Sequence, residues 1–245
     1  MKPHTVRRTS LLIALLFLVF FLSSQAGFSV PSGADISFNS TEYGPTRPPD
    51  MRNDTRGTIT TVILNAVQQD QHWKAYIGNI SGSYSLDDAS NYTIYDWDLT
   101  GTITGQVYAS RWSNVSWSSI SCASHSLIIA ESTFHNMTSA KPDRINATFN
   151  WSIHKEFQVG GNTIPQSTCN STVTYVSDTR QVPTTSSPYQ EVLVMDTTNS
   201  YLIYMTSIND GSTGYNDQTN DFQLIVAESD IKSSPTPYYF YVELR

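Results

Sequence analysis

The chain has 245 residues, of which 39% are hydrophobic and only 14% are charged, and its formal net charge is −7 at pH 7. Serine and threonine make up about a quarter of the chain, and 14 Tyr, 10 Phe and 5 Trp supply ring area for a core. This composition excludes a chain that is disordered throughout. An acidic surface repels phosphate backbones, so we expect no nucleic-acid partner.

The first 26 residues have the pattern of a secretory signal peptide. Three basic residues come first: Lys2, Arg7 and Arg8. An unbroken apolar run of twelve residues, 11–22, follows, and Ser24 and Ala26 place small side chains where a signal peptidase cleaves. The alternative is a retained anchor, but twelve helical residues span only about 18 Å of the roughly 30 Å hydrocarbon core. We therefore expect a secreted or cell-surface protein that contacts the membrane only if this segment stays uncleaved.

Nine asparagines stand in N-x-Ser/Thr sequons. They are Asn39, Asn53, Asn79, Asn91, Asn114, Asn136, Asn146, Asn150 and Asn170. Composition alone would give roughly four, so the excess indicates glycosylation acceptors on an exported surface. The alternative is the Ser/Thr bias itself. All nine precede residue 172, so the last part of the chain is expected to form the side of the protein without glycans, or the more buried side.

The chain has two cysteines, Cys122 and Cys169. In an oxidising compartment the simplest outcome is one disulfide between them. The alternatives are two separate buried thiols or a pair of cysteine thiols that holds no metal ion. No C-x-x-C motif lies nearby, which argues against a redox or zinc role.

Residues 27–56 have the composition of a flexible linker, because the proline-rich stretch 43–50 has almost no apolar side chains to bury. From residue 57 to residue 245 we expect one domain. Its predicted strands are, in chain order, 58–67, 73–78, 79–86, 92–97, 102–110, 145–151, 157–164, 172–176, 189–195, 201–208, 222–227 and 238–244. Apolar residues spaced by three and four within 117–130 allow a helical turn or two. About ten short strands and at most one short helix predict an all-β, sandwich-like fold.

Several strings of this domain occur together in a fixed order. They are 73–82, 95–97, 107–111, 157–160 and 238–244, with Cys122 and Cys169 between them. This pattern resembles a β-rich module found in exported proteins of archaea, mostly of unassigned function. The resemblance covers about residues 57–245. It implies a surface location and a pairing of Cys122 with Cys169, and it implies no catalytic residue.

No catalytic motif stands out. The chain has no H-E-x-x-H, no G-x-S-x-G elbow and no glycine pattern that would cradle a phosphate. Asp87 and Asp88, and Asp96 and Asp98, are neighbouring carboxylates of the kind that a glycosidase uses, but such a pair must be set by the fold. We therefore expect no enzymatic activity.

Two features of the sequence suit ligand binding. The loop 210–221 has glycines for tight turns and the hard oxygen donors that suit Ca²⁺: Asp210, Asn216, Asp217, Asn220 and Asp221. The alternative is an ordinary polar hairpin loop, and we expect no other cofactor. Trp112 and Trp117 lie near irregular structure and a sequon, where they would suit sugar stacking, although strand aromatics usually belong to a core.

Together these features predict a non-enzymatic secreted or cell-surface protein with a structural or adhesive role. Its partners would be other surface proteins or glycans. The first alternative is a carbohydrate-binding module, and the second is a hydrolase.

Overall fold

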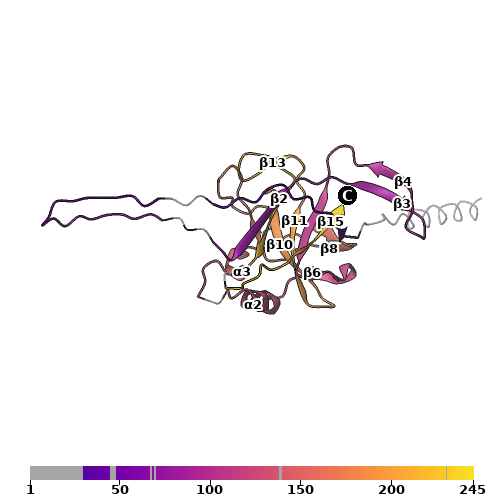
Figure 1. Ribbon diagram of the computed structural model, residues 1–245. Helices are drawn as coiled ribbons and strands as arrows, with labels where there is room; N and C mark the ends of the chain where they lie inside the picture. The colour runs from indigo at the N-terminus through magenta and orange to yellow at the C-terminus, as the bar shows by residue number, and fades with distance from the viewer. Residues whose placement is uncertain (1–29, 45–47, 67, 69, 138–139, 230) are drawn as a thin grey trace, which may run out of the picture.

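The computed structural model describes residues 30–44, 48–66, 68, 70–137, 140–229 and 231–245 (Figure 1). The predicted signal peptide, 1–26, lies outside them. In the part of the chain that is described, no helix is long and apolar enough to cross a membrane.

One antiparallel sheet of seven strands forms the centre of the fold. Its path is β1 (Ser32–Gly33), β15 (Tyr239–Leu244), β5 (Gly105–Ser110), β11 (Tyr201–Ser207), β10 (Gln190–Asp196) and β6 (Ile120–Cys122), with β9 (Ser171–Val173) also paired to β10. Strands β5, β10 and β11 are almost entirely buried. Their continuous apolar runs therefore face packed side chains on both sides of the sheet.

A first layer covers one face of this sheet. It consists of the ribbon of β2 (Trp73–Gly78) and β14 (Phe222–Ala227), with α2 (His125–Phe134) and α3 (Ile145–Thr148) beside it (Figure 1). Leu193 and Tyr204 of the sheet join Leu224, Ile128 and Phe149 of the cover in one buried cluster. This cluster draws its buried side chains from the sheet, from β14 and from both helices, so it holds the first cover on the sheet.

A second layer covers the other face. The hairpin of β7 (Phe157–Val159) and β8 (Asn162–Ile164) packs with Cys169 on Tyr108, Val192 and Ile203 of the sheet. Cys122 and Cys169 form the predicted disulfide, which joins β6 to the segment before β9. The bridge thus ties this short cover to the sheet.

Other elements lie at the periphery. A ribbon of β3 (Ser83–Asp87) and β4 (Thr93–Asp98) projects from the body with every residue exposed (Figure 1). The loop 210–221 contains the small hairpin of β12 (Ser212–Thr213) and β13 (Thr219–Asn220), and a 3₁₀ turn, η1 (Trp117–Ser119), precedes β6. A two-stranded ribbon has little stability of its own in water, so β3 and β4 are the least supported part of the sheet structure.

The prediction of an all-β fold is confirmed, with three differences in detail. Instead of two facing sheets of similar size, one large sheet carries smaller pieces on both faces. The described residues form two α-helices rather than one, because the expected strand at 145–151 begins with α3. Ile145 and Phe149 are both fully buried, and their spacing of four places them on one side of a helical turn.

The third difference concerns the stretch before β2. The described residues of the expected strand 58–67 have no strand partner and are exposed. The described residues of the expected linker, 30–44 and 48–56, are likewise largely without regular structure, but Ser32 and Gly33 pair with Val242 and Tyr241 at the edge of the central sheet. Part of the linker is therefore anchored to the domain.

Replacing both cysteines with serine should lower the free energy of unfolding by about 4 kcal/mol, because the bridge closes a loop of 47 residues in the unfolded chain. Urea denaturation of the oxidised protein and of the C122S/C169S variant measures this difference. The wild type under reducing conditions is the control and should match the variant. A loss below about 1 kcal/mol would show that the second cover is held by its packing alone.

A buried carboxyl joins the first cover to the sheet. Glu191 of β10 is fully buried, and its Oε2 accepts a hydrogen bond of 2.9 Å from the backbone N–H of Ile225 in β14. Burial raises the pKa of Glu191 well above its usual value. The folded state therefore binds this proton more tightly than the unfolded chain, and stability falls as the pH rises above the ordinary carboxyl range.

Glu191→Gln should accordingly raise the unfolding free energy at pH 7, by about 1.4 kcal/mol for each unit of pKa difference, and should change it little at pH 4. Thermal or urea unfolding at both pH values measures the effect. Glu156→Gln is the matched control because Glu156 is exposed. An equal effect of E191Q at pH 4 and pH 7 would contradict the assignment of a protonated Glu191.

Candidate functional site

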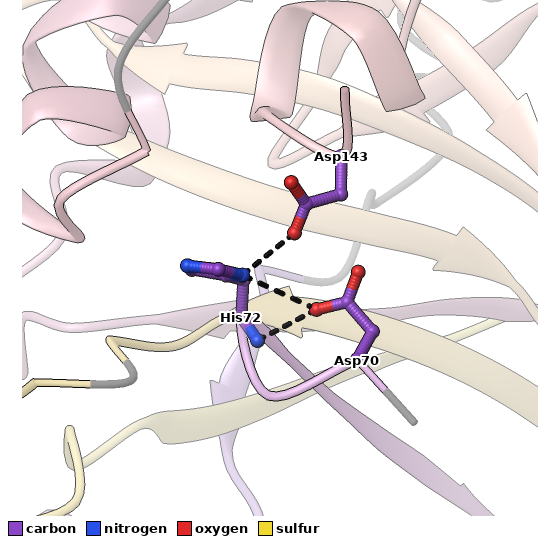
Figure 2. Close-up of side chains that lie close together, drawn as sticks. All are labelled: Asp70, His72 and Asp143. Atoms are coloured by element: carbon purple, nitrogen blue, oxygen red, sulfur yellow. Dashed lines mark hydrogen bonds and ion pairs between the residues drawn. The ribbon is translucent and has the colours of Figure 1, made fainter. Parts of the chain in front are cut away.

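Three side chains converge where the chain enters β2. The Nδ1 atom of His72 lies 2.7 Å from Oδ2 of Asp143 and 3.4 Å from Oδ1 of Asp70 (Figure 2). These three atoms all lie within 4.8 Å of one another. Within the described ranges, no other group of three His, Cys, Asp or Glu side chains converges in this way.

Backbone and side-chain contacts fix the position of these residues. The backbone N–H of His72 donates to Oδ1 of Asp70 at 2.7 Å, and the carbonyl of His72 accepts from the N–H of Glu228 at 2.7 Å. The indole N–H of Trp73 and the hydroxyl of Thr148 donate to the carbonyl of Asp143, at 2.9 and 3.1 Å. The site is therefore built from the entry to β2 and from the loop before α3.

The electrostatics of the site follow from two carboxylates beside one imidazole. His72 is buried, Asp143 is half-buried and Asp70 is exposed. Partial burial raises the pKa of Asp70, and the neighbouring Asp143 adds to this, whereas the backbone N–H and the ring of His72 oppose it. Such a donor set can hold a cation, or it can fix the orientation of the imidazole ring by hydrogen bonds. This site could not be predicted from the sequence, because nothing in the spacing of residues 70, 72 and 143 marks them as neighbours.

A second feature is the exposed segment 51–66, which we call the arm. Every residue of it is exposed, and Figure 1 shows it extending far from the sheet before the chain returns to β2. Its apolar side chains are almost fully exposed at Met51 (92%), Ile59 (101%), Ile63 (96%) and Leu64 (88%). Large aliphatic side chains exposed close together are common on surfaces that contact other molecules.

The predicted sugar-stacking pair does not form a shared platform. Trp112 is 41% exposed and stacks on Tyr201, with ring centres 4.5 Å apart and planes 11° apart. Trp117 is half-buried between Tyr108 and Tyr241, with ring centres 5.0 Å from each. Trp117 thus belongs to the core under the second cover, and Trp112 alone remains at the surface.

The oxygen donors of the predicted calcium loop do not point to one centre. The carboxylate of Asp221 accepts the N–H of Ile80 at 2.7 Å and that of Gly211 at 2.8 Å, and Asp210 accepts the N–H of Ile103 at 2.9 Å. Asn216 caps its own turn by accepting from Gln218. The exposed Asp217 and the half-buried Asn220 complete the loop. These contacts are those of a polar hairpin loop whose carboxylates satisfy backbone donors.

The candidate glycosylation sites divide by accessibility. Six are exposed: Asn39, Asn53, Asn79, Asn91, Asn114 and Asn150. Asn136, Asn146 and Asn170 are half-buried, and the Nδ2 of Asn170 donates to the carbonyl of Phe149 at 2.9 Å. The last part of the sequence, which has no sequons, supplies β10, β11 and β14, and these strands are largely buried.

A buried polar network lies between the first cover and β5. Arg111 donates to both carboxylate oxygens of Glu131, at 2.6 and 2.8 Å, and Nε2 of His135 lies 3.1 Å from Glu131 and 3.4 Å from the hydroxyl of Tyr238. Burial alone would raise the pKa of Glu131, but the hydrogen bonds from Arg111 and His135 hold the pKa below its usual value. The network thus joins Arg111, Glu131, His135 and Tyr238 to one another, whereas Nδ1 of His135 is buried without a hydrogen-bond partner.

No protein-family model, no curated protein and no solved structure matches this chain.

A second ionic contact holds the base of β2 to the end of β14. Glu228 pairs with Lys74 and accepts from the N–H and the hydroxyl of Thr236, at 2.9 and 2.6 Å. Burial would raise the pKa of Glu228, but these contacts lower it to about 2. Because the unfolded chain binds this proton at a higher pH, the contact stabilises the fold above about pH 4.5 and is lost as the pH falls toward 2.

Between pH 5 and pH 2 the wild type should therefore lose up to about 3 kcal/mol at this site, less where solvent screens the charges. Glu228→Gln should remove this part of the pH dependence. Urea unfolding at several pH values measures it, with E156Q again as the control on the exposed surface. If E228Q and the wild type lost stability in parallel, the acid sensitivity would lie elsewhere.

Proposed function

We propose that this protein is a non-enzymatic structural subunit of an extracytoplasmic assembly. In this assembly the arm of one copy adds as a strand to the outer edge of β2 in the next copy. The observation that carries the proposal is the exposed run 58–66, which has the composition of a strand and no strand partner among the residues that the structure describes.

The arm has the side-chain pattern of a donated strand. In an extended conformation Ile59 and Ile63 would lie on one side, and Val62 and Leu64 on the other. β-branched residues favour this conformation. Full burial of such a side chain contributes about 1.5–3 kcal/mol, so four would contribute about 6–12 kcal/mol. This is comparable to the about 4–15 kcal/mol that association costs, and backbone hydrogen bonds would add to it.

The acceptor is the outer edge of β2. In the described part of the chain β2 pairs with one strand only, β14. Ala75 and Ile77 of β2 are exposed, whereas Tyr76 packs against Phe240 of the central sheet with ring centres 4.8 Å apart. An added strand would extend this ribbon and receive backbone hydrogen bonds from a firmly packed strand.

A second copy is the occupant that the chain itself supports. Donor and acceptor are different surfaces of one sequence, which is the condition for a head-to-tail contact. The outer edge of β15, in contrast, is already covered in part by β1. The net charge of −7 opposes close approach of copies, so assembly should strengthen as salt screens the charges.

Two observations support the extracytoplasmic location. The protein has a disulfide between Cys122 and Cys169, and disulfides form and persist in oxidising compartments. Six of the nine sequons are exposed on the arm, the ribbon of β3 and β4, and loops of the body, where glycans could be attached without loss of packing.

One observation favours a second function. Trp112 is 41% exposed at the surface, and an exposed indole of this kind can pack on a sugar ring. A glycan array with the wild type and with Trp112→Ala tests it. Binding to one sugar class that is lost in W112A would support a carbohydrate-binding role.

The arm contact is tested by a proline substitution in its run. Ile63→Pro removes one backbone donor and disfavours strand pairing, so it should weaken self-association at least tenfold, which corresponds to about 1.4 kcal/mol. Both the wild type and the variant should remain folded, because the side chain of Ile63 is 96% exposed. Analytical ultracentrifugation of the full oxidised chain over a range of protein and salt concentrations measures association.

Met51→Pro is the matched control, since Met51 is equally exposed on the arm but lies outside the run. Amide hydrogen exchange of the assembled protein should show new protection at 58–66 and at β2. A wild-type chain that stays monomeric at millimolar concentration, or equal weakening by I63P and M51P, would refute the proposal. Pairing of the arm with a different surface protein would also leave the pure chain monomeric.

A further inference from the structure

We infer that Asp70, His72 and Asp143 form a binding site for a divalent transition-metal ion, for which Zn²⁺ is the natural probe. The inference stands independently of the arm contact, because it concerns three residues of one chain. The site also differs from the calcium loop expected at 210–221, whose carboxylates are used by backbone donors.

The chemistry of the donor set selects the class of ion. One imidazole nitrogen and two carboxylate oxygens are typical ligands of Zn²⁺ and of its first-row neighbours. Ca²⁺ and Mg²⁺ prefer sites made of oxygen alone, and Ca²⁺ takes six to eight of them. A site with a central, buried His72 therefore fits a transition metal better than an alkaline-earth ion.

The distances fit three ligands of one small ion. Ligand atoms at about 2.0–2.1 Å from a tetrahedral Zn²⁺ lie about 3.3 Å from one another. The separation of Nδ1 of His72 from Oδ1 of Asp70 is 3.4 Å and already has this value. The separation from Oδ2 of Asp143 is 2.7 Å, so this carboxylate must move outward by about 0.6 Å to replace its hydrogen bond with a metal bond.

The surrounding contacts allow this movement without a change in the backbone. The carbonyl of Asp143 is held by Trp73 and Thr148, which fixes the main chain and leaves the carboxylate to rotate. Its side chain is 19% exposed and that of Asp70 is 40% exposed, whereas that of His72 is 10% exposed. The site is thus anchored on a buried ring and open on the side of Asp70, which provides an entry path and room for a water as the fourth ligand.

A bound ion would join two distant parts of the fold. Asp70 and His72 lie at the base of the arm, directly before β2, and Asp143 precedes α3. An ion that binds the folded state alone stabilises it, so metal should raise the midpoint of thermal unfolding and should protect the entry to β2 from hydrogen exchange.

Isothermal titration of the full, oxidised chain with Zn²⁺ after removal of metal by a chelator tests the site. We expect one high-affinity ion per chain. Asp70→Asn is the main variant, because its Oδ1 can still accept the N–H of His72 while the charge is lost. Affinity should fall at least tenfold in D70N and in H72Q, and Co²⁺ should give the visible spectrum of a four-coordinate site that is absent from H72Q.

His125→Gln and Asp217→Asn are the matched controls, since both side chains are exposed and lie outside the site. Circular dichroism of every variant verifies that the fold is kept. The inference is overturned if the wild type binds Zn²⁺ no more tightly than D70N, or if H125Q abolishes binding instead. Stronger binding of Ca²⁺ than of Zn²⁺ at these residues would also overturn it.

Discussion

The central sheet is buried on both faces, and this constraint decides the arrangement of most other segments. Successive side chains of β11 enter opposite cores: Ile203 lies under the hairpin of β7 and β8, and Tyr204 under the cover that contains β14 and α2. Each face therefore needs a separate cover drawn from elsewhere in the chain. The hairpin of β7 and β8 has three residues in each strand, so it depends on the sheet and on the disulfide for its position.

Burial on two faces also places polar groups inside the molecule, and most are paired across distant parts of the chain. The hydroxyl of Tyr108 donates to Glu243 of the neighbouring strand at 2.9 Å. His154 is buried beside the disulfide, where its Nε2 accepts the N–H groups of Thr168 and Cys169, and burial lowers the pKa of this ring. Such contacts specify one arrangement of the covers, because any other would leave buried polar atoms without partners.

Local pattern was sufficient for the strands whose side chains form continuous apolar runs. Strands β10, β11, β14 and β15 were predicted within a residue or two of their ends for this reason. The stretch 145–148 was mistaken for a strand because Ile145 and Phe149, only four positions apart, fit the period of a strand as well as that of a helix. The run 58–66 has strand composition, but a strand also requires a neighbour, and that condition is not written in the local sequence.

The site at His72 could not be predicted for a related physical reason. It exists because Trp73 reaches the carbonyl of Asp143 across 70 positions of sequence, and short motifs do not encode such tertiary contacts. For the loop 210–221 the sequence left two interpretations open, a calcium site and an ordinary polar hairpin loop. In the structure the carboxylate of Asp221 accepts the N–H of Ile80 from outside the loop and that of Gly211 from within it.

The arm and the edge of β2 are separate elements, and this separation gives any array built from them a direction. Every internal copy would use both surfaces, whereas one terminal copy would present an unoccupied edge and the other an unpaired run. Growth would then proceed by addition of monomers at chemically distinct tips. A molecule with the edge but without the run would cap one tip alone and so set the length of the array.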